Sequence, residues 1–203
     1  DSVNLGVGQG YLSATPAQLA FYSAFIGNKG SLEKLSLINN SIDKDILVLQ
    51  ASNITNEDWD RIHKSMIGVI ENPKGTAKRL KNLKSYNIAA KSGTVELVSL
   101  DSKEDYEIVR EDILKRDHGI MIAFAPMPNP KYAISVVIEN AESGGSVAGP
   151  VAVKVLNSLI KEWSKHRLKD LLFFLINTYL SPSLYYPLWD YSSYIAHHRA
   201  IST

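Results

Sequence analysis

The fold is decided by Ile120-Met121-Ile122-Ala123-Phe124-Ala125 and by Tyr132-Ala133-Ile134-Ser135-Val136-Val137-Ile138-Glu139. The first stretch is continuously apolar and of strand length, which is typical of a strand in the centre of a sheet. The second is also predicted as a strand. Met127-Pro128-Asn129-Pro130 lies between them and has turn chemistry. The two stretches therefore predict a hairpin.

Three helices are predicted around this hairpin. Thr15-Pro16 marks the start of the first, because Thr is a good N-cap and Pro suits the first helical position. Its apolar residues run to Ile26, and Gly27-Asn28-Lys29-Gly30 ends it. The second starts at Thr55, and its apolar residues recur at spacings of three and four, which gives one apolar face. The third runs from about Val147.

Two further strand-like segments complete the prediction. One lies around Ile88–Val98, ahead of a charge-rich segment from Asp101 to Lys115 that we expect to be a surface insertion with some helix. The other is a short run at Ile46–Leu49. Antiparallel strands with helices on their faces make an α+β fold, with an antiparallel sheet flanked by helices, rather than a doubly wound one.

Composition excludes several classes of function. The chain has 203 residues, with 22 basic and 21 acidic side chains and a formal net charge of +1. That balance argues against a nucleic-acid binder that works through phosphate contacts. The chain has no cysteine, which removes disulfides, thiolate metal sites, cysteine nucleophiles and iron–sulfur clusters.

Both ends of the chain are informative. The start, Asp1-Ser2-Val3-Asn4, has neither an initiator Met nor a signal peptide, so we interpret the chain as part of a longer protein. Residues 167–203 are an apolar, Tyr-rich tail of unknown role. The apolar run at Leu171–Ile176 is shorter than the roughly 18–20 residues that a membrane span needs. We therefore expect one unit at 1–166 and a separate tail at 167–203.

Lys91-Ser92-Gly93-Thr94 is the stretch that carries the most chemistry. On a strand at the edge of a cleft, a Lys and two hydroxyls can hold a carboxylate. A glycine there lets a substrate backbone lie along the strand. The same tetrad also occurs in ordinary turns, so it needs support from its context. Lys91, Ser92, Gly93 and Thr94 are our candidate substrate-binding residues.

That context is a resemblance to the penicillin-binding proteins. It is carried by Gly8-Gln9-Gly10-Tyr11-Leu12-Ser13-Ala14-Thr15-Pro16-Ala17-Gln18-Leu19-Ala20, by Ile88-Ala89-Ala90-Lys91-Ser92-Gly93-Thr94, and by residues 118–126 and 129–134, which look like the hairpin that follows. It covers about residues 1–165, and it is greatest to the class B branch that serves the elongation of rod-shaped cells. It implies the C-terminal part of a transpeptidase domain with a serine β-lactamase-like fold.

The resemblance also implies an activity and a location. Such enzymes cross-link peptidoglycan: a serine attacks the penultimate D-Ala of a stem peptide, and β-lactams acylate the same serine. Lys91, Ser92 and Thr94 would form the wall that binds the substrate carboxylate, without metal or organic cofactor. The implied partners are stem peptides, β-lactams and, through the parent protein, membrane proteins of the elongation complex. The implied location is the periplasmic face of a bacterial inner membrane.

The catalytic serine itself is not expected in this chain. In the family, Ser-x-x-Lys and Ser-x-Asn both precede the Gly-Gln-Gly segment, so they should lie upstream. Literal Ser-x-x-Lys matches stand at Ser31–Lys34, Ser41–Lys44 and Ser158–Lys161, in polar, loop-like or mid-helix settings that do not suit the dry site this chemistry needs. Ser2-Val3-Asn4 and Ser85-Tyr86-Asn87 match Ser-x-Asn by letters only.

Other groups have simpler interpretations. Gly6-Val7-Gly8-Gln9-Gly10 is not a dinucleotide fingerprint. Ser143-Gly144-Gly145-Ser146 is a loop with a capping serine, which the resemblance places near the rim of the cleft, although such a loop can also bind an anion. His118 is a turn or strand-end residue, and His197-His198 lacks a partner set for a metal. The acidic residues between 104 and 112 alternate with Lys and Arg, as on a solvated face.

Two alternatives stay open at this point. A serine β-lactamase or a β-lactam sensor of the same fold would use the same Lys-Ser-Gly wall, although the long match at residues 8–20 favours the transpeptidase. A truncated or split product that acts only as an interaction module would fit the missing nucleophile and the unusual tail.

Overall fold

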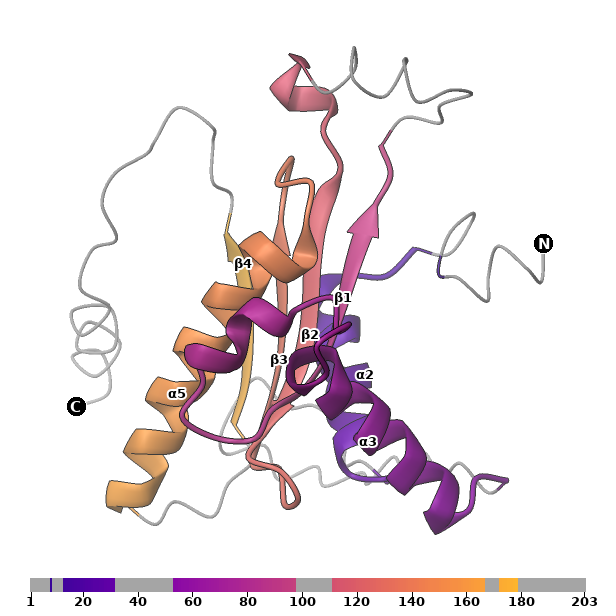
Figure 1. The fold of residues 1–203 in the computed structure, drawn as a ribbon, viewed down its shortest axis with the longest axis vertical. Coiled ribbons are helices and arrows are strands. Elements are labelled where there is room, and N and C mark those ends of the chain that lie inside the picture. Colours follow the sequence, from indigo (N-terminus) through magenta and orange to yellow (C-terminus); the bar gives the residue numbers. More distant parts are fainter. Residues whose placement is uncertain (1–7, 9–12, 32–52, 98–110, 167–171, 179–203) are drawn as a thin grey trace, which may run out of the picture.

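The computed structural model describes residue 8 and residues 13–31, 53–97, 111–166 and 172–178. Figure 1 shows a single sheet with helices on both of its faces, so the predicted α+β fold is confirmed. The predicted strand at residues 46–49 lies outside the described residues. The elements in chain order are α2 (Pro16–Gly27), α3 (Asn56–Glu71), η1 (Lys78–Asn82), β1 (Ala89–Val95), η2 (Ile113–Lys115), β2 (His118–Ala125), β3 (Tyr132–Ile138), η3 (Gly144–Ala148), α5 (Gly149–His166) and β4 (Leu172–Thr178).

The sheet is built around the predicted hairpin. Its strand order is β1-β2-β3-β4, and β2 pairs antiparallel with both β1 and β3. Residues 121–125 of β2 are all buried, as expected for a continuous apolar run in the centre of a sheet. The backbone N–H of Lys131 donates to the carbonyl of Ala125 over 2.9 Å and closes the turn between β2 and β3.

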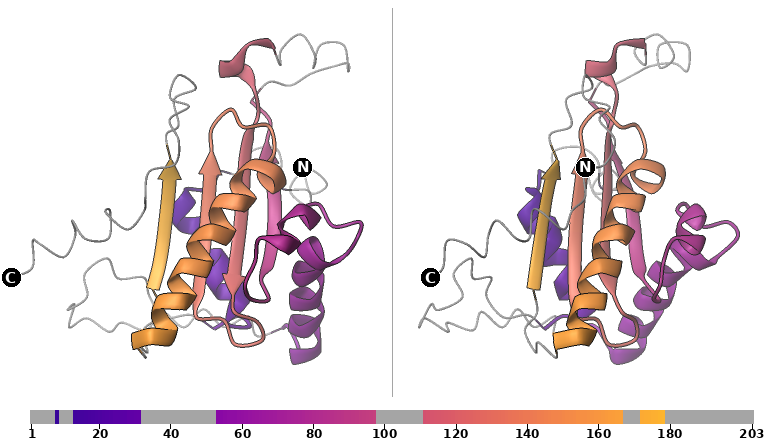
Figure 2. Two further views of the ribbon diagram at one scale, coloured as in Figure 1. Left: turned by 60° about the vertical axis from the view of Figure 1, so that its left-hand side comes forward. Right: turned by 90° about the vertical axis from the view of Figure 1, so that its left-hand side faces the viewer.

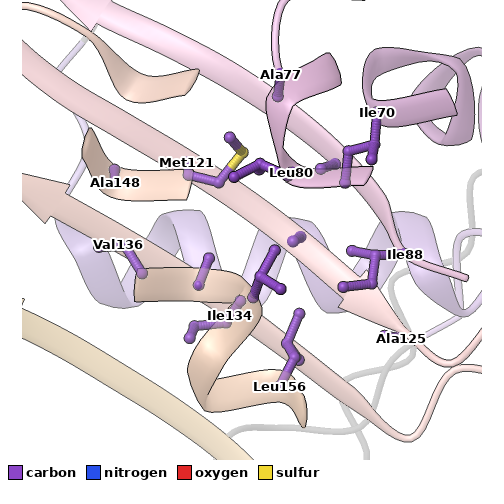
Figure 3. Packing of buried hydrophobic residues seen from close by; sticks show 14 of the residues in the cluster. Ile70, Ala77, Leu80, Ile88, Met121, Ala125, Ile134, Val136, Ala148 and Leu156 are labelled. Atoms are coloured by element: carbon purple, nitrogen blue, oxygen red, sulfur yellow. The ribbon is translucent and has the colours of Figure 1, made fainter. Parts of the chain in front are cut away.

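Helices cover both faces of the sheet, and each face has its own apolar core. Figure 2 shows α5 in front of the strands and α2 behind them. On the α5 side, Ile134, Val136 and Leu156 are fully buried, and Figure 3 shows the packing of this cluster. On the α2 side, Phe124 packs with Trp59 and Ile26. Helix α3 contributes to both clusters, because it runs past the edge of the sheet beside β1.

The helix starts follow their capping residues. The Thr15 hydroxyl accepts from the N–H of Gln18 at 3.2 Å, and Thr55 accepts from the N–H of Asp58 at 3.2 Å. Each N3 side chain bonds back to the capping residue, which completes a capping box at both helices. Helix α5 begins at Gly149 rather than at the predicted Val147, because Gly144–Ala148 forms a separate π-helical turn.

Two buried polar side chains tie α2 in place. The Ser23 hydroxyl donates to the carbonyl of Ala123 in β2 over 3.0 Å. Nε2 of His63, on α3, lies 2.8 Å from the carbonyl of Ile26 at the end of α2. Since an unpaired polar group is costly in a core, these contacts select the positions of both helices as well as stabilising them.

The tail contributes one strand that our sequence analysis did not predict. Leu172–Thr178 forms β4, which pairs in parallel with β3 in a register that runs from Tyr132 opposite Leu172 to Ile138 opposite Thr178. A parallel neighbour requires a crossover, and α5 supplies it. The division at residue 166 remains a prediction. No helix in the described ranges is both long and apolar enough to cross a bilayer.

Glu71 gives a prediction for the dependence of stability on pH. Its carboxylate lies 2.7 Å from Nζ of Lys84 and 3.3 Å from Nζ of Lys81, and chiefly the Lys84 hydrogen bond lowers the pKa of Glu71 below its ordinary 4.5. A lowered carboxyl pKa adds stability above pH 4.5 that is lost as the pH falls through the lower folded-state value. We expect Glu71→Gln to flatten the acid limb of the free energy of unfolding, measured by urea denaturation between pH 3 and 7. Glu57→Gln on the same helix is the control, and an unchanged acid limb in Glu71→Gln would contradict the prediction.

Candidate functional site

The tetrad lies where β1 leaves the core. Ala89 and Ala90 are buried, whereas Lys91 and Thr94 are exposed and Ser92 is half-buried. In the described part of the chain, β1 pairs with β2 only, so one of its edges carries no neighbouring strand. An unpaired strand edge offers backbone N–H and C=O groups to an extended peptide.

The side chains of the tetrad point to both faces of the strand. Successive residues of a strand alternate between faces. Ala89 belongs to the core on the α2 side and Ala90 to the core on the α5 side. Lys91 therefore shares the α2 side, and Ser92 shares the α5 side with Thr94. The sequence had suggested that Lys91, Ser92 and Thr94 form one wall. In the structure the Lys91 side chain lies on the α2 side of β1 and the two hydroxyls lie on its α5 side, so the tetrad shares only the edge of the strand.

Ser92 is held by a contact that the sequence did not reveal. Its Oγ lies 2.8 Å from Oγ1 of Thr76, which precedes η1. The peptides on both sides of Thr76 are bonded to the end of α3, since Gly75 donates to the carbonyl of Asn72 and Ala77 donates to that of Val69. Nothing in the local pattern around Thr76 marks it, because its partner is 16 residues away.

The Ser143–Ser146 turn packs directly on the tetrad. The Ser143 hydroxyl accepts from the N–H of Ser146 at 3.3 Å, which is the predicted cap. A side chain on Gly144 would collide with the carbonyls of Gly93 and Ile120, so the two backbones lie in contact there. The predicted loop is therefore part of the structure that supports β1.

Gly93 differs from these supporting glycines. A Cβ at Gly93 would meet only Cβ of Ile120, at an ordinary 3.5 Å, so the packing of the described residues does not require glycine at this position. A close approach by something outside the strand is the usual remaining reason for a glycine in a strand.

The segment that leads into the tetrad is rich in basic side chains. Residues 72–95 include six basic side chains and no acidic one. Two of the six, Lys81 and Lys84, are paired with Glu71. The ammonium of Lys91 donates to the carbonyl of Ser92. The remaining basic side chains of this segment would favour an anionic ligand, and Glu96 follows the segment directly.

His118 has a structural contact. It starts β2 opposite Val95, and its Nδ1 accepts a hydrogen bond from the N–H of Asn140 at 3.0 Å. Asn140 has a positive φ of 56°, and its side chain donates to the carbonyls of Leu114 and Arg116. This agrees with the interpretation of His118 as a strand-end residue.

The nucleophile candidates are not seen beside the tetrad. Ser158 donates to the carbonyl of Lys154 within α5 and is exposed, and Ser31 is exposed after the end of α2. The N–H of Ser85 donates to Asn157 in α5. The matches at 2–4 and 41–44, the pair at 197–198 and the acidic residues up to 110 lie outside the described residues. Among the described side chains, no group of three or more His, Cys, Asp or Glu is placed to hold a metal ion.

Comparisons with known proteins point in one direction. Residues 1–157 match the model of the penicillin binding protein transpeptidase domain. The peptidoglycan D,D-transpeptidase MrdA of Salmonella typhimurium is 34% identical over 167 residues, which cover 78% of this chain and 27% of that protein. The chain thus spans about a quarter of the length of the curated relatives it matches.

Solved structures show the same fold. PBP2 of Pseudomonas aeruginosa, in complex with WCK 5153, superimposes with a TM-score of 0.59 at 29% identity, covering 84% of this chain and 35% of that one. PBP2 of Helicobacter pylori in its complex with MreC gives a TM-score of 0.61 at 24% identity, covering 80% of this chain and 28% of that one.

Gly144→Ala tests the contact between the turn and β1. Because the added methyl group meets backbone carbonyls on two strands, the turn must move, and we expect the variant to lose about 1–3 kcal/mol of unfolding free energy. Urea denaturation measures this loss. Ser146→Ala, at an exposed position of the same turn, is the control and should change stability by less than about 0.5 kcal/mol. Equal stability of the two variants would show that the turn is not held against β1.

Proposed function

The chain belongs to the penicillin-binding protein transpeptidase family, and we propose that its residues 1–166 form the C-terminal part of a D,D-transpeptidase domain that cross-links peptidoglycan stem peptides. Its part in the reaction is to hold the free carboxylate end of a stem peptide, or of a β-lactam that mimics it, along the open edge of β1.

The observation that carries this proposal is the exposed edge at Lys91–Thr94. An extended peptide that adds to this edge would pair with the backbone of β1, as peptides do at other open sheets. Its terminal carboxylate would then lie between the Lys91 ammonium and the hydroxyls of Ser92 and Thr94. Charge-assisted hydrogen bonds from these groups would fix its position. Gly93, where the packing of the described residues would accept a side chain, would let the peptide backbone come close.

The chemical step itself needs a serine from outside the described residues. That serine attacks the penultimate D-Ala carbonyl, and its proton passes through a neighbouring base to the leaving nitrogen. The bond to the terminal D-Ala then breaks, and free D-Ala leaves. The amine of a second stem peptide then attacks the acyl-enzyme and releases the serine. A β-lactam opens its ring on the same serine and stays attached.

Helix α2 supports the idea that another part of the domain packs here. Pro16–Gly27 is mostly apolar and has no distinct polar face, a composition that belongs to a buried helix. In this chain only one side of α2 faces the sheet: Tyr22 is 53% exposed, and Leu19, Phe21 and Phe25 are only partly buried. We propose that the segment with the nucleophile covers this outer side of α2. Lys91 lies on the same face of the sheet as α2.

Location and partners are proposals that rest on family membership. We place the parent protein at the periplasmic face of a bacterial inner membrane, with membrane proteins of the elongation complex as partners. A β-lactamase or β-lactam sensor would share the β1 edge but not the transpeptidation. Rapid hydrolysis of a chromogenic cephalosporin by the parent would favour the lactamase.

A labelling experiment tests where the nucleophile lies. Because none of the three literal Ser-x-x-Lys matches suits the chemistry, the 203-residue chain alone should form no covalent adduct with fluorescent penicillin. Salmonella MrdA serves as the positive control in the same gel. A stable adduct on Ser31, Ser41 or Ser158, located by mass spectrometry, would place the nucleophile in this chain and contradict the proposal.

A chimera tests the carboxylate-binding edge. Residues 1–157 replace the matched segment of Salmonella MrdA, and the rate of acylation by fluorescent penicillin is measured. We expect Lys91→Ala or Thr94→Ala to slow acylation by about tenfold or more, which corresponds to about 1.4 kcal/mol of barrier. Ser65→Ala, an exposed serine on α3, is the control. Acylation at the unmodified rate in both edge variants would remove the proposed role of β1.

A further inference from the structure

We propose that Thr76 is a positioning residue for Ser92: its hydroxyl donates to Ser92 Oγ and leaves the Ser92 proton pointing to the carboxylate of the substrate. This inference rests on the proposed function, because it concerns the same edge of β1. The two oxygens lie 2.8 Å apart, which is a normal O–H···O distance, and the geometry allows either one to be the donor.

An anionic ligand decides which hydroxyl donates. Each hydroxyl has one proton and two lone pairs. If Ser92 gave its proton to Thr76, it would present only lone pairs to the carboxylate, which when ionised can only accept. If Thr76 donates instead, the Ser92 proton is available to the anion. The two hydrogen bonds then run in series, and each polarises the other.

Thr76 can do this because its backbone is fixed on several sides. Its neighbours donate to carbonyls of Asn72 and Val69 at the end of α3, over 2.8 and 3.0 Å. A Cβ on Gly145 would lie 2.6 Å from the Thr76 carbonyl, so the η3 turn is in contact with it as well. A hydroxyl held in this way orders Ser92 before the ligand arrives, which lowers the entropic cost of binding.

Thr76 can also be replaced without disturbing the core. Its residue is exposed and Ser92 is half-buried, so replacing either leaves no large cavity. Thr76→Val keeps the shape and removes the hydroxyl, and Thr76→Ser keeps the hydroxyl. A purely structural role would make Val the better replacement for Thr in packing terms, whereas a positioning role makes Ser the better one.

The experiment is a double-mutant cycle in the MrdA chimera. Acylation by fluorescent penicillin is measured for Thr76→Val, Thr76→Ser, Ser92→Ala and the Thr76→Val/Ser92→Ala pair, each with its thermal unfolding midpoint. We expect Thr76→Val to slow acylation by about three- to tenfold, the loss of one neutral hydrogen bond. Thr76→Ser should recover the original rate to within about twofold, and Thr76→Val should cause no further loss once Ser92 is Ala.

Each other result identifies what has failed. Thr76 does not act through Ser92 if the Thr76→Val chimera acylates at the original rate. The same conclusion follows if Thr76→Val slows acylation by the same factor whether residue 92 is Ser or Ala. If Thr76→Val lowers the unfolding midpoint and Thr76→Ser does not restore the rate, Thr76 acts on folding. In these cases the positioning role of Thr76 is wrong, while the proposed carboxylate-binding role of the β1 edge still stands. If Lys91→Ala and Ser92→Ala both acylate normally, the proposed function itself is wrong.

Discussion

Seven residue pairs join β1 to β2, from Ala89 opposite Phe124 to Val95 opposite His118. The position of the tetrad depends on this ladder. Because β2 is buried throughout residues 121–125, its register is strongly determined, and a slip of one residue would turn every side chain of β1 to the opposite face. The pairing therefore sets which side of the strand receives Lys91 and which receives the hydroxyls. Among the described strands, it also leaves the other edge of β1 without a strand partner.

Two segments that are far apart in the chain support this strand. The end of α3 fixes Thr76, the turn at Ser143–Ser146 lies against Gly93, and both meet where Gly145 contacts Thr76. Glycines allow this because a side chain at Gly144 or Gly145 would collide with backbone. Close backbone packing of this kind makes a rigid support, which would suit the proposed role of β1 in holding a ligand in one orientation.

The same arrangement is consistent with the proposed division, in which this chain supplies a binding edge and another part of the protein supplies the nucleophile. Helix α5 packs on one face of the sheet and α2 on the other, where Tyr22 stays exposed and Leu19, Phe21 and Phe25 are only partly buried. A site that lies beside such a surface can be completed by a further part of the protein. The side of β1 that receives Lys91 is the one on which this completion would occur.

The sequence by itself determined the local features of this protein. Capping residues predicted the starts of α2 and α3, apolar runs predicted β2 and β3, and the spacing of three motifs indicated the family, which the comparisons confirmed. The strand β4, the division of the tetrad between two faces and the contact of Thr76 with Ser92 came only from the tertiary structure. Periodicity and capping are properties of neighbouring residues, whereas these contacts depend on register and on the packing of segments that are distant along the chain.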